Sequence, residues 1–435
     1  MKNIFSFLKK QSVPRIIAMS FAVLILIGSL LLMLPFSVKK GVELSYTDAL
    51  YTSTSAVCVT GLIAVDAGDT FTPIGQAILA LLIQVGGLGI TTIGAGFIIA
   101  LGKKVHLKGR SLIKEASNLS SGKEIVSFVK EVIITTAVIE LIGAILGFFV
   151  FIKDFSPLKA VGVSLFHSIA SFNNAGFDIF GNYQNLIPYR DNLFLNIITC
   201  GLIFFGGIGF LVIREMREKL LKKTRFSMHA KIVLSVSGVL ILVGTLLIKL
   251  TEKVSWLGAF FFSISARTAG FSTYSLGEFG TAGILTLIVL MFIGASPGST
   301  GGGIKTSTFF VLLKGIKSAA TNTSEKAFKY AIPKDAFKKA SVIALLALGV
   351  VVSSTYILTI LEPQISLADA IFEMTSAFAT VGLSTGITQT LSVGGKLLSV
   401  LVMYIGRLGP MTVATLWFFS RGERIRYAEG NIAIG

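Results

Sequence analysis

The amino-acid sequence predicts an all-α polytopic membrane protein, and both its composition and its hydropathy indicate this class. Of the 435 residues, 53% are hydrophobic and only 14% are charged, against roughly 25% charged in an average soluble domain. The mean hydropathy is +0.81, so lipid is expected to solvate most of the chain. A soluble globular protein is therefore excluded. The net charge of +17 is expected to mark one membrane face and not a nucleic-acid surface.

Eight apolar runs are predicted to cross the membrane. Each approaches or exceeds the roughly 20 residues that a helix rising 1.5 Å per residue needs to cross a 30 Å hydrocarbon core. The first run is longer than the apolar region of a signal peptide, and no small-residue cleavage pattern follows it, so it is predicted to remain as a span. The predicted spans cover residues 16–35, 74–101, 132–152, 192–213, 232–250, 281–315, 341–361 and 395–419.

Short semi-apolar segments and basic loops alternate between these spans, which predicts a fourfold repeat of span, short segment and span. The short segments are rich in Ser, Thr, Ala and aromatic residues and are too polar to cross the membrane themselves. The predicted repeats are 16–101, 131–213, 232–315 and 341–419; the loops that join them are 102–130, 214–231 and 316–340, and the tails are 1–15 and 420–435.

The distribution of charge predicts the orientation. Of the 39 Lys and Arg residues, 28 fall in the two tails, the 102–130 and 214–231 loops and residues 314–339, so the positive-inside rule places these loops and both termini in the cytoplasm. The opposite face holds 12 acidic and eight basic residues, a balance that would concentrate cations there. Ordinary insertion topology is the alternative to this steering role, and it explains the inner excess of positive charge fully and the outer deficit in part. Arg267, Lys305, Arg407 and Glu140 are predicted to lie at membrane depth.

A segment of small and polar residues that ends on glycine recurs four times, at 55–62, 170–177, 265–271 and 376–383. A second glycine cluster follows in the next span each time, at Gly86, Gly206, Gly294 and Gly406. These clusters begin 25, 30, 24 and 24 residues after the glycine that ends the segment. Three nearly equal spacings support one common register.

The glycine-ended segments predict non-helical backbone at membrane depth, which is tolerated where it is buried or lines a water-filled cavity. Four such loops around an axis would present rings of carbonyl oxygens that replace the water shell of K⁺, and Thr-Val-Gly is the core of the K⁺ filter sequence. The fourth loop contains this core unchanged. The predicted filter residues, which would ligate K⁺ through backbone carbonyls, are Val59, Thr60, Gly61, Asn174, Ala175, Gly176, Thr268, Ala269, Gly270, Thr380, Val381 and Gly382.

Each loop is predicted to follow a short helix that enters the membrane from outside. The candidate N-cap residues are Ser45 or Thr47, Ser156, Ser255 and Ser366. Asp48 and Asp369 fall in or near a first turn, where a carboxylate complements the helix dipole. The C-terminal ends of these helices would then direct partial negative charge at the loops, which favours a cation.

The sixth span is predicted to break at 294–308, because this stretch contains Pro297 and five glycines. In a helix interior a proline lowers stability by about 3 kcal/mol and each glycine by ~1 kcal/mol. A mobile polar loop at this depth must line a cavity. The glycine run superficially resembles a phosphate-binding loop, but that motif ends in Gly-Lys-Ser/Thr, whereas Ile304 separates Gly303 from Lys305 here. Nucleotide binding is therefore not expected at this segment.

With these loops and spacings, essentially the whole chain resembles the Ktr/Trk/HKT superfamily of K⁺ and Na⁺ transporters, and the KtrB-type membrane subunits most. The resemblance implies four membrane-pore-membrane repeats around one central pore and K⁺ uptake across the bacterial plasma membrane, with Na⁺ as a candidate activator. It also implies a homodimer and a cytoplasmic KtrA-like ring that alone would bind ATP or ADP, with no cofactor in this chain. Gly61 favours K⁺, although the first three loops depart from Thr-Val-Gly.

The resemblance further implies that the broken sixth span is an intramembrane gate below the filter. Arg407 would limit cation flow there, or would instead be tied to Glu140 or to backbone carbonyls. Lys305 would take part in the gate or extend to the cytoplasmic surface. Arg267, Cys58, Asn173 and Asn174 are expected to pack behind the filter. The predicted gate residues are Gly294, Ser296, Pro297, Gly298, Gly301, Gly302, Gly303, Lys305 and Arg407.

Two other classes of protein are weighed against this interpretation. A secondary transporter with alternating access would show inverted repeats, whereas the four repeats share one orientation. A membrane enzyme would need a His cluster, a carboxylate pair or a Ser-His set at workable spacing, and the sequence shows none, so no enzymatic activity is expected. The basic loops would contact the regulatory partner or anionic membrane lipids.

Overall fold

The computed structural model describes residues 11–89, 92–95 and 125–415, most of which are helical. Most of the predicted tails and most of the 102–130 loop lie outside these residues. The principal helices are α2 (Val13–Leu32), α3 (Tyr46–Val57), α4 (Ala67–Thr70), α5 (Pro73–Leu88), α8 (Ile125–Phe151), α9 (Pro157–Phe172), α10 (Leu193–Ile208), α11 (Phe210–Lys222), α12 (Met228–Thr251), α13 (Trp256–Ser265), α14 (Thr281–Phe292), α15 (Thr306–Thr321), α16 (Ala336–Leu361), α17 (Leu367–Ala379), α18 (Val393–Leu408) and α19 (Pro410–Thr415). A two-residue hairpin, β1 (Lys326–Ala327) and β2 (Tyr330–Ala331), follows α15.

Four helices in the described residues, α2, α8, α12 and α16, are long and apolar enough to cross a membrane. They agree with the first, third, fifth and seventh predicted spans, although α8 and α16 begin several residues earlier than predicted. The bent pair α10 and α11 passes the same criteria as one broken span, with an angle of 106° between the two helices.

The predicted spans at 74–101, 192–213 and 395–419 are each interrupted by a glycine within the described residues. Helices α5, α10 and α18 each have 16 residues and stop at Gly89, Gly209 and Gly409, whose φ angles are +83°, +91° and +85°. Backbone in this left-handed region cannot continue a right-handed helix. Hydropathy counts glycine as neutral or apolar, so it does not reveal these breaks.

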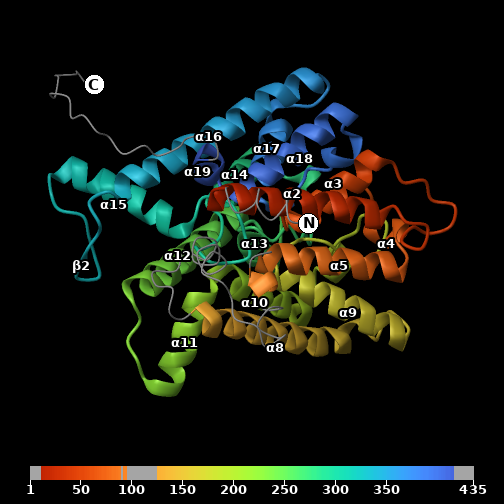
Figure 1. Cartoon of the computed structure of the whole chain (residues 1–435), viewed down its shortest axis with the longest axis horizontal. Helices are drawn as coiled ribbons and strands as arrows, with labels where there is room; N and C mark the ends of the chain where they lie inside the picture. Colours follow the sequence, from red (N-terminus) through yellow and green to blue (C-terminus); the bar gives the residue numbers. More distant parts are fainter. Residues whose placement is uncertain (1–10, 90–91, 96–124, 416–435) are drawn as a thin grey trace.

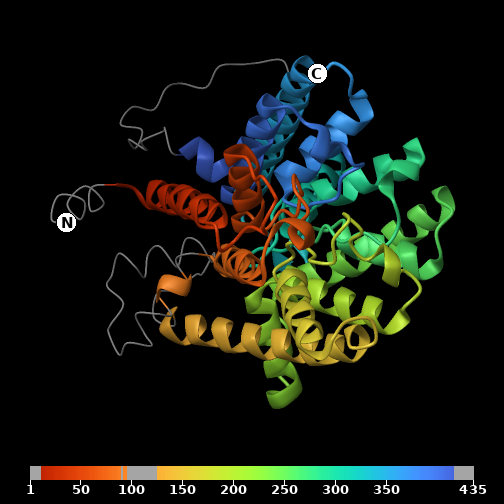
Figure 2. The ribbon, with the colours of Figure 1, turned by 90° about the vertical axis from the view of Figure 1, so that its right-hand side faces the viewer.

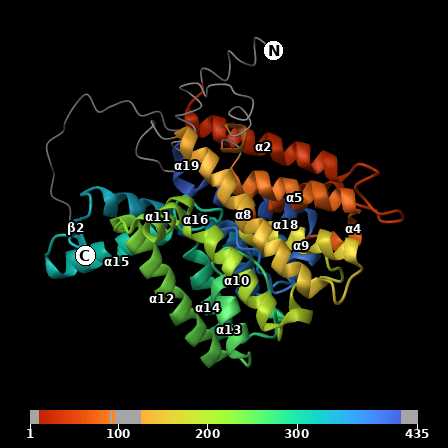
Figure 3. The ribbon, with the colours of Figure 1, turned by 90° about the horizontal axis from the view of Figure 1, so that it is seen from below.

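The helices follow one another around a common centre in the order of the sequence. In Figure 2 the red and orange helices, the yellow helices, the green helices and the blue helices occupy successive sectors. Helix α15 and the β1–β2 hairpin project from one end of the molecule (Figure 1), and the view from below separates α2, α5 and α8 from α12, α13 and α14 (Figure 3).

One packing contact occurs three times, each time among three helices: a long helix (α2, α8 or α12), the short helix that follows it (α3, α9 or α13) and a third helix (α5, α10 or α14). A glycine of the long helix faces a serine hydroxyl and a leucine side chain, and the serine donates to the carbonyl three residues before that glycine. Close approach of the helices therefore depends on the missing side chain. The three sets are Gly28, Ser53, Leu82 and Ile25; Gly143, Ser168, Leu202 and Glu140; and Gly244, Ser263, Leu290 and Ile241, with serine-to-carbonyl distances of 2.7, 2.6 and 2.8 Å.

Substituting valine for Gly244 is expected to lower the free energy of unfolding by about 1–3 kcal/mol, the usual cost of overpacking. A Cβ at this position would overlap Ser263 Oγ and a methyl group of Leu290. Gly238→Val is the matched control, because nothing lies within 4 Å of a Cβ there on the same helix. Thermal unfolding of the two purified variants in detergent checks the difference; equal stability would contradict the packing contact.

The short helices begin at the predicted caps. The hydroxyls of Ser45, Ser255 and Ser366 accept backbone N–H bonds of 3.1, 3.0 and 3.2 Å, so Ser45 and not Thr47 caps α3. Ser156 is the N-cap residue of α9 but its side chain makes no capping bond. The C-terminal ends of α3, α9, α13 and α17 lead directly into the glycine-ended loops.

Polar contacts join the first and last sectors and so complete the circle. Lys396 Nζ at the start of α18 forms an ion pair with Asp48 Oδ1 of α3 at 2.7 Å, and both side chains are largely buried. Tyr51 and Ser399 share a buried hydrogen bond of 3.1 Å. These two pairs connect residues nearly 350 positions apart in the sequence.

Candidate functional site

Four loops, here called the glycine loops (59–61, 174–176, 268–270 and 380–382), share one backbone conformation. In each, the glycine and the residue two before it have positive φ angles. The third loop has this conformation although it is one residue closer to its preceding serine, Ser265, than the first loop is to Ser55. The φ angles are +51° and +91° for Val59 and Gly61, +56° and +67° for Asn174 and Gly176, +78° and +72° for Thr268 and Gly270, and +50° and +97° for Thr380 and Gly382.

The glycine loops form a closed ring. A Cβ added to the glycine of any loop would overlap the carbonyl oxygen of the residue before the glycine in the next loop, and the fourth loop meets the first in the same way. Since glycine alone leaves room for these oxygens, the ring requires glycine at all four positions. The pairs are Gly61 with Ala175, Gly176 with Ala269, Gly270 with Val381, and Gly382 with Thr60.

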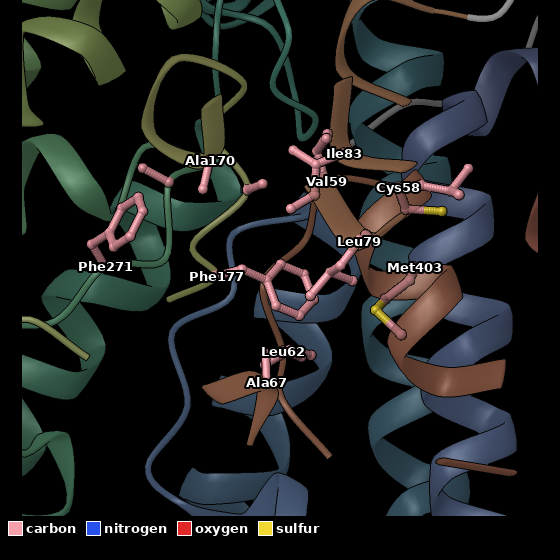
Figure 4. Packing of buried hydrophobic residues seen from close by; sticks show 14 of the residues in the cluster. Cys58, Val59, Leu62, Ala67, Leu79, Ile83, Ala170, Phe177, Phe271 and Met403 are labelled. Atoms are coloured by element: carbon pink, nitrogen blue, oxygen red, sulfur yellow. The ribbon is translucent and has the colours of Figure 1, made fainter. Parts of the chain in front are cut away.

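The ring is held from behind by serines and by buried hydrophobic side chains. Ser55 Oγ accepts a 3.0 Å bond from the Gly61 N–H, and Ser376 Oγ accepts the same bond from Gly382. The residue after each glycine is fully or almost fully buried, and Figure 4 shows three of these residues within the hydrophobic packing. They are Leu62, Phe177, Phe271 and Leu383.

Glu373 supports the fourth loop but is not among the predicted site residues. This carboxylate of α17 is fully buried and accepts hydrogen bonds from Ser384 Oγ, at 2.8 Å, and from Thr388. It therefore ties the chain that follows Gly382 to the short helix that precedes it. An acidic residue in the middle of the short helix, beyond the first turn where Asp369 complements the dipole, was the available signal.

A cavity of about 190 Å³, here called the vestibule, opens on one side of the ring and is lined by Gly61, Gly270, Gly382 and Asp178. Asp178 was also not predicted as a site residue. Its side chain is only 4% exposed, and burial raises the pKa of this carboxyl to about 7, against the opposing effect of a 3.1 Å hydrogen bond from the Phe180 N–H. Its charge therefore changes near neutral pH.

Lowering the pH from 8 to 6 is expected to reduce cation entry through the vestibule severalfold. With a pKa of about 7, Asp178 goes from about 90% to about 10% ionised over this range, and the local negative potential falls with it. Asp178→Asn should remove this pH-dependent component. Asp191→Asn is the control, since that carboxylate is 78% exposed. Tracer flux into vesicles measures the effect, and an unchanged pH profile in Asp178→Asn would contradict it.

The opposite side of the ring is covered by residues 294–305, here called the 294–305 segment. Gly301 and Gly302 lie against the side chains of Thr268 and Thr380, with no room for a Cβ at either glycine. Thr300 Oγ1 donates a 3.1 Å bond to the Gly206 carbonyl. The break in the predicted sixth span is thus confirmed, and the broken backbone packs directly against the glycine loops.

A backbone bridge and a hydrogen bond between two side-chain hydroxyls fix both ends of the 294–305 segment. Ile293 and Ile304 form a parallel bridge at its base, and Thr306 donates to Ser296 Oγ at 3.0 Å. The other predicted gate residues in this segment also make close backbone contacts or have positive φ angles. Gly294 lies against the Gly302 carbonyl, Gly209 against the Pro297 carbonyl, the Gly298 carbonyl accepts from Phe210 N, and Gly298 and Gly303 both have φ of +69°.

Arg407 and Lys305 hold the 294–305 segment through its carbonyl oxygens. The Arg407 guanidinium donates to the carbonyls of Thr300, Gly86 and Gly87, the last at 3.1 Å. Lys305 Nζ donates to the Gly301 carbonyl at 2.6 Å. Both cations line a second cavity of about 280 Å³, here called the inner cavity. The segment therefore separates the ring from a cavity that carries positive charge.

Glu140 is not the partner of Arg407, so that alternative is excluded. It accepts hydrogen bonds from the side-chain amides of Gln84 and Asn173 at 3.2 and 3.0 Å. Asn173 therefore packs behind the second loop, as expected, with its amide turned toward Gln84 and Glu140.

The remaining predicted side chains also point away from the ring or lie below it. Arg267 turns toward α12, where its guanidinium donates to Ser237 Oγ at 3.0 Å. Cys58 is buried in the hydrophobic core (Figure 4). The amide of Asn174 lies 3.2 Å from Thr268 Oγ1, so these two side chains meet beneath the ring.

Comparison with known proteins decides the family. The TrkH family, described as cation transport protein, matches residues 8–247 and 232–421. The chain belongs to this family. It is therefore a multi-pass membrane protein that transports cations, and it is not an enzyme.

Curated members of the family align with nearly the full chain. Ktr system potassium uptake protein B of Bacillus subtilis is 35% identical, over 97% of this chain and 96% of its own length. Potassium/sodium uptake protein NtpJ of Enterococcus hirae is also 35% identical, with 98% of both chains covered. The solved structure of the potassium transporter TrkH from Vibrio parahaemolyticus shares the fold, with a TM-score of 0.73 at 19% identity, over 94% of this chain and 86% of that chain.

Proposed function

We propose that this chain takes up K⁺ across the bacterial plasma membrane and that the ring of glycine loops is its selectivity filter. The closed ring carries the proposal, because its carbonyl oxygens come from four chain segments in one conformation and can replace the hydration shell of a desolvated cation. The B. subtilis and E. hirae relatives are named potassium and potassium/sodium uptake proteins, which supports K⁺ as the ion. Na⁺ enters the proposal as an activator.

The 294–305 segment is the gate in this proposal. Its contacts with Thr268 and Thr380 close the pathway between the ring and the inner cavity. Lys305 and Arg407 add positive charge at the same place, which opposes the passage of K⁺. Opening requires the Arg407 hydrogen bonds to break and the segment to move into the inner cavity.

The proposed assembly has four membrane-pore-membrane repeats, eight spans and both termini in the cytoplasm. The three recurrent glycine–serine contacts and the shared loop conformation support the repeats. Two chains would form a homodimer on a KtrA-like ring that binds ATP or ADP. The basic helix α11 and the hairpin after α15 are the proposed docking surfaces, since both carry Lys residues and lie toward the same end of the molecule (Figure 1).

Complementation of a bacterium that lacks K⁺ uptake tests this function. We expect growth on low K⁺ when the chain is expressed with a KtrA-type partner, and faster growth when Na⁺ is added. A chain detected in the membrane that fails to restore growth even with the partner would overturn K⁺ uptake and favour another transported solute. Unchanged growth on Na⁺ addition would remove the activator role alone.

A further inference from the structure

A third, strongly apolar cavity of about 690 Å³ lies between α14, α15, α16 and α17. Its volume falls in the range of about 300–1,000 Å³ typical of small-molecule sites. Among the residues that the structure describes, no charged side chain lines it, and its polar lining consists of hydroxyl groups from Thr355, Tyr356, Thr359 and Thr375. A ligand for this cavity must therefore be apolar over most of its length.

The cavity opens on the outer surface of the helix bundle. Among its lining residues, Leu348, Val352 and Tyr356 of α16 are 52%, 59% and 67% exposed, and Leu367 of α17 is 62% exposed. In a membrane protein such exposed apolar side chains face lipid tails. Access to the cavity is thus from the bilayer, and an empty apolar space of this size would forfeit its dispersion contacts.

The part of α16 that lines the cavity is long and carries three hydroxyl groups near its C-terminal end, on Thr355, Tyr356 and Thr359. The cavity's lining on α16 runs from Ala344 to Thr359, a rise of about 22 Å at 1.5 Å per residue. One leaflet of a ~30 Å hydrocarbon core is about 15 Å thick, so the cavity is long enough to hold the full depth of a single acyl chain. Thr355 is buried, and its hydroxyl makes no hydrogen bond among the described residues.

The inner wall of this cavity is the base of the proposed gate. Ile293 and Ile304, which form the bridge at the two ends of the 294–305 segment, both line the cavity. Ile304 N donates to the Phe292 carbonyl at 3.2 Å, and Phe292 lines the cavity as well. Any occupant therefore packs against the residues about which the segment would have to move.

We propose that this cavity binds one acyl chain of a membrane lipid and that the bound chain stabilises the closed position of the 294–305 segment. The gating part rests on the proposed function; the binding part does not. A charged protein segment is a poor occupant, because the cavity offers no partner for a charge. The 416–435 tail, for example, carries Arg421, Glu423, Arg424 and Arg426.

Photolabelling tests the binding. The full-length protein is reconstituted into vesicles of phosphatidylethanolamine and phosphatidylglycerol that contain a phospholipid with a diazirine in its acyl chain, and labelled peptides are located by mass spectrometry. We expect label on α14 and on 344–359 of α16, reduced at least about fivefold in Val351→Trp, which fills the cavity. Leu345→Trp is the control, since Leu345 is 70% exposed on the same helix and does not line the cavity. Ala344→Phe serves as a second filling variant if Val351→Trp does not fold.

Two results would overturn the site. Equal labelling of the filling variants and the wild type would show that the label comes from general lipid contact. Absence of label on α16 together with disulfide cross-linking of Leu348→Cys between two chains would show that a second copy covers the cavity.

Flux through the same vesicles tests the gating part. We expect Val351→Trp to change basal K⁺ flux at least about threefold relative to Leu345→Trp, and equal flux in the two would remove the effect on the gate. Labelling that disappears in Val351→Trp without any K⁺ transport by the wild type would retain the lipid site and reject the proposed function. K⁺ transport by the wild type without labelling of the cavity would reject the lipid site and retain the proposed function.

Discussion

Serine in place of Gly61 or Gly382 is expected to lower the preference for K⁺ over Na⁺ at least about tenfold, equivalent to ~1.4 kcal/mol. The Cβ of the new residue would overlap the carbonyl oxygen of Ala175 or of Thr60 in the neighbouring loop. Both positions also have φ above +90°, a conformation that residues with a Cβ resist. The carbonyls must shift, and the ring no longer matches a desolvated K⁺. Competition of Na⁺ with K⁺ or Rb⁺ uptake in vesicles measures the change.

The matched control for Gly382 is Gly386→Ser, four residues further along the same chain. Gly386 has a φ of +103°, but nothing lies within 4 Å of a Cβ there. This variant therefore has the same kind of backbone strain without the collision with another loop. Unchanged selectivity in both Gly61→Ser and Gly382→Ser would reject the ring as the filter. Equal loss in Gly386→Ser would show that strain alone is responsible.

Local features of this protein were predictable from its sequence. Ser45, Ser255 and Ser366 cap their helices as predicted, because a cap depends on the few residues around it. The four glycine-ended segments also have a common backbone conformation. Because a positive φ strongly favours glycine, the recurring glycine marks the same backbone position in each segment. The break at Pro297 follows from the same local logic.

Features that depend on which segments meet were not predictable. Glu373 supports the fourth loop because it binds Thr388, and Asp178 acts because it lines the vestibule. Spacing in the sequence reveals neither of these contacts. The choice of Arg407 between Glu140 and backbone carbonyls is decided by three segments that lie far apart in the chain. The stops at Gly89, Gly209 and Gly409 were hidden within runs of high hydropathy.

Replacing Arg407 with glutamine is expected to raise K⁺ flux in the absence of a regulatory partner by about tenfold or more. The guanidinium connects Thr300 of the 294–305 segment to Gly86 and Gly87 at the end of α5. Hydrogen bonds to a charged group contribute about 1.5–3 kcal/mol each, so loss of these bonds releases the segment. Loss of the charge also lowers the electrostatic barrier in the inner cavity. Tracer efflux from vesicles that hold only this chain gives the measurement.

Arg407→Lys separates these two causes. A lysine keeps the charge but cannot hold three carbonyls in the fork geometry of a guanidinium. If the hydrogen bonds hold the gate closed, Arg407→Lys should leak nearly as much as Arg407→Gln; if the charge alone blocks the pore, it should stay closed. Deletion of residues 298–303 should leak in either case, because it removes Gly301 and Gly302 from beneath the ring. A deletion variant that folds and stays closed would show that the segment is not the gate.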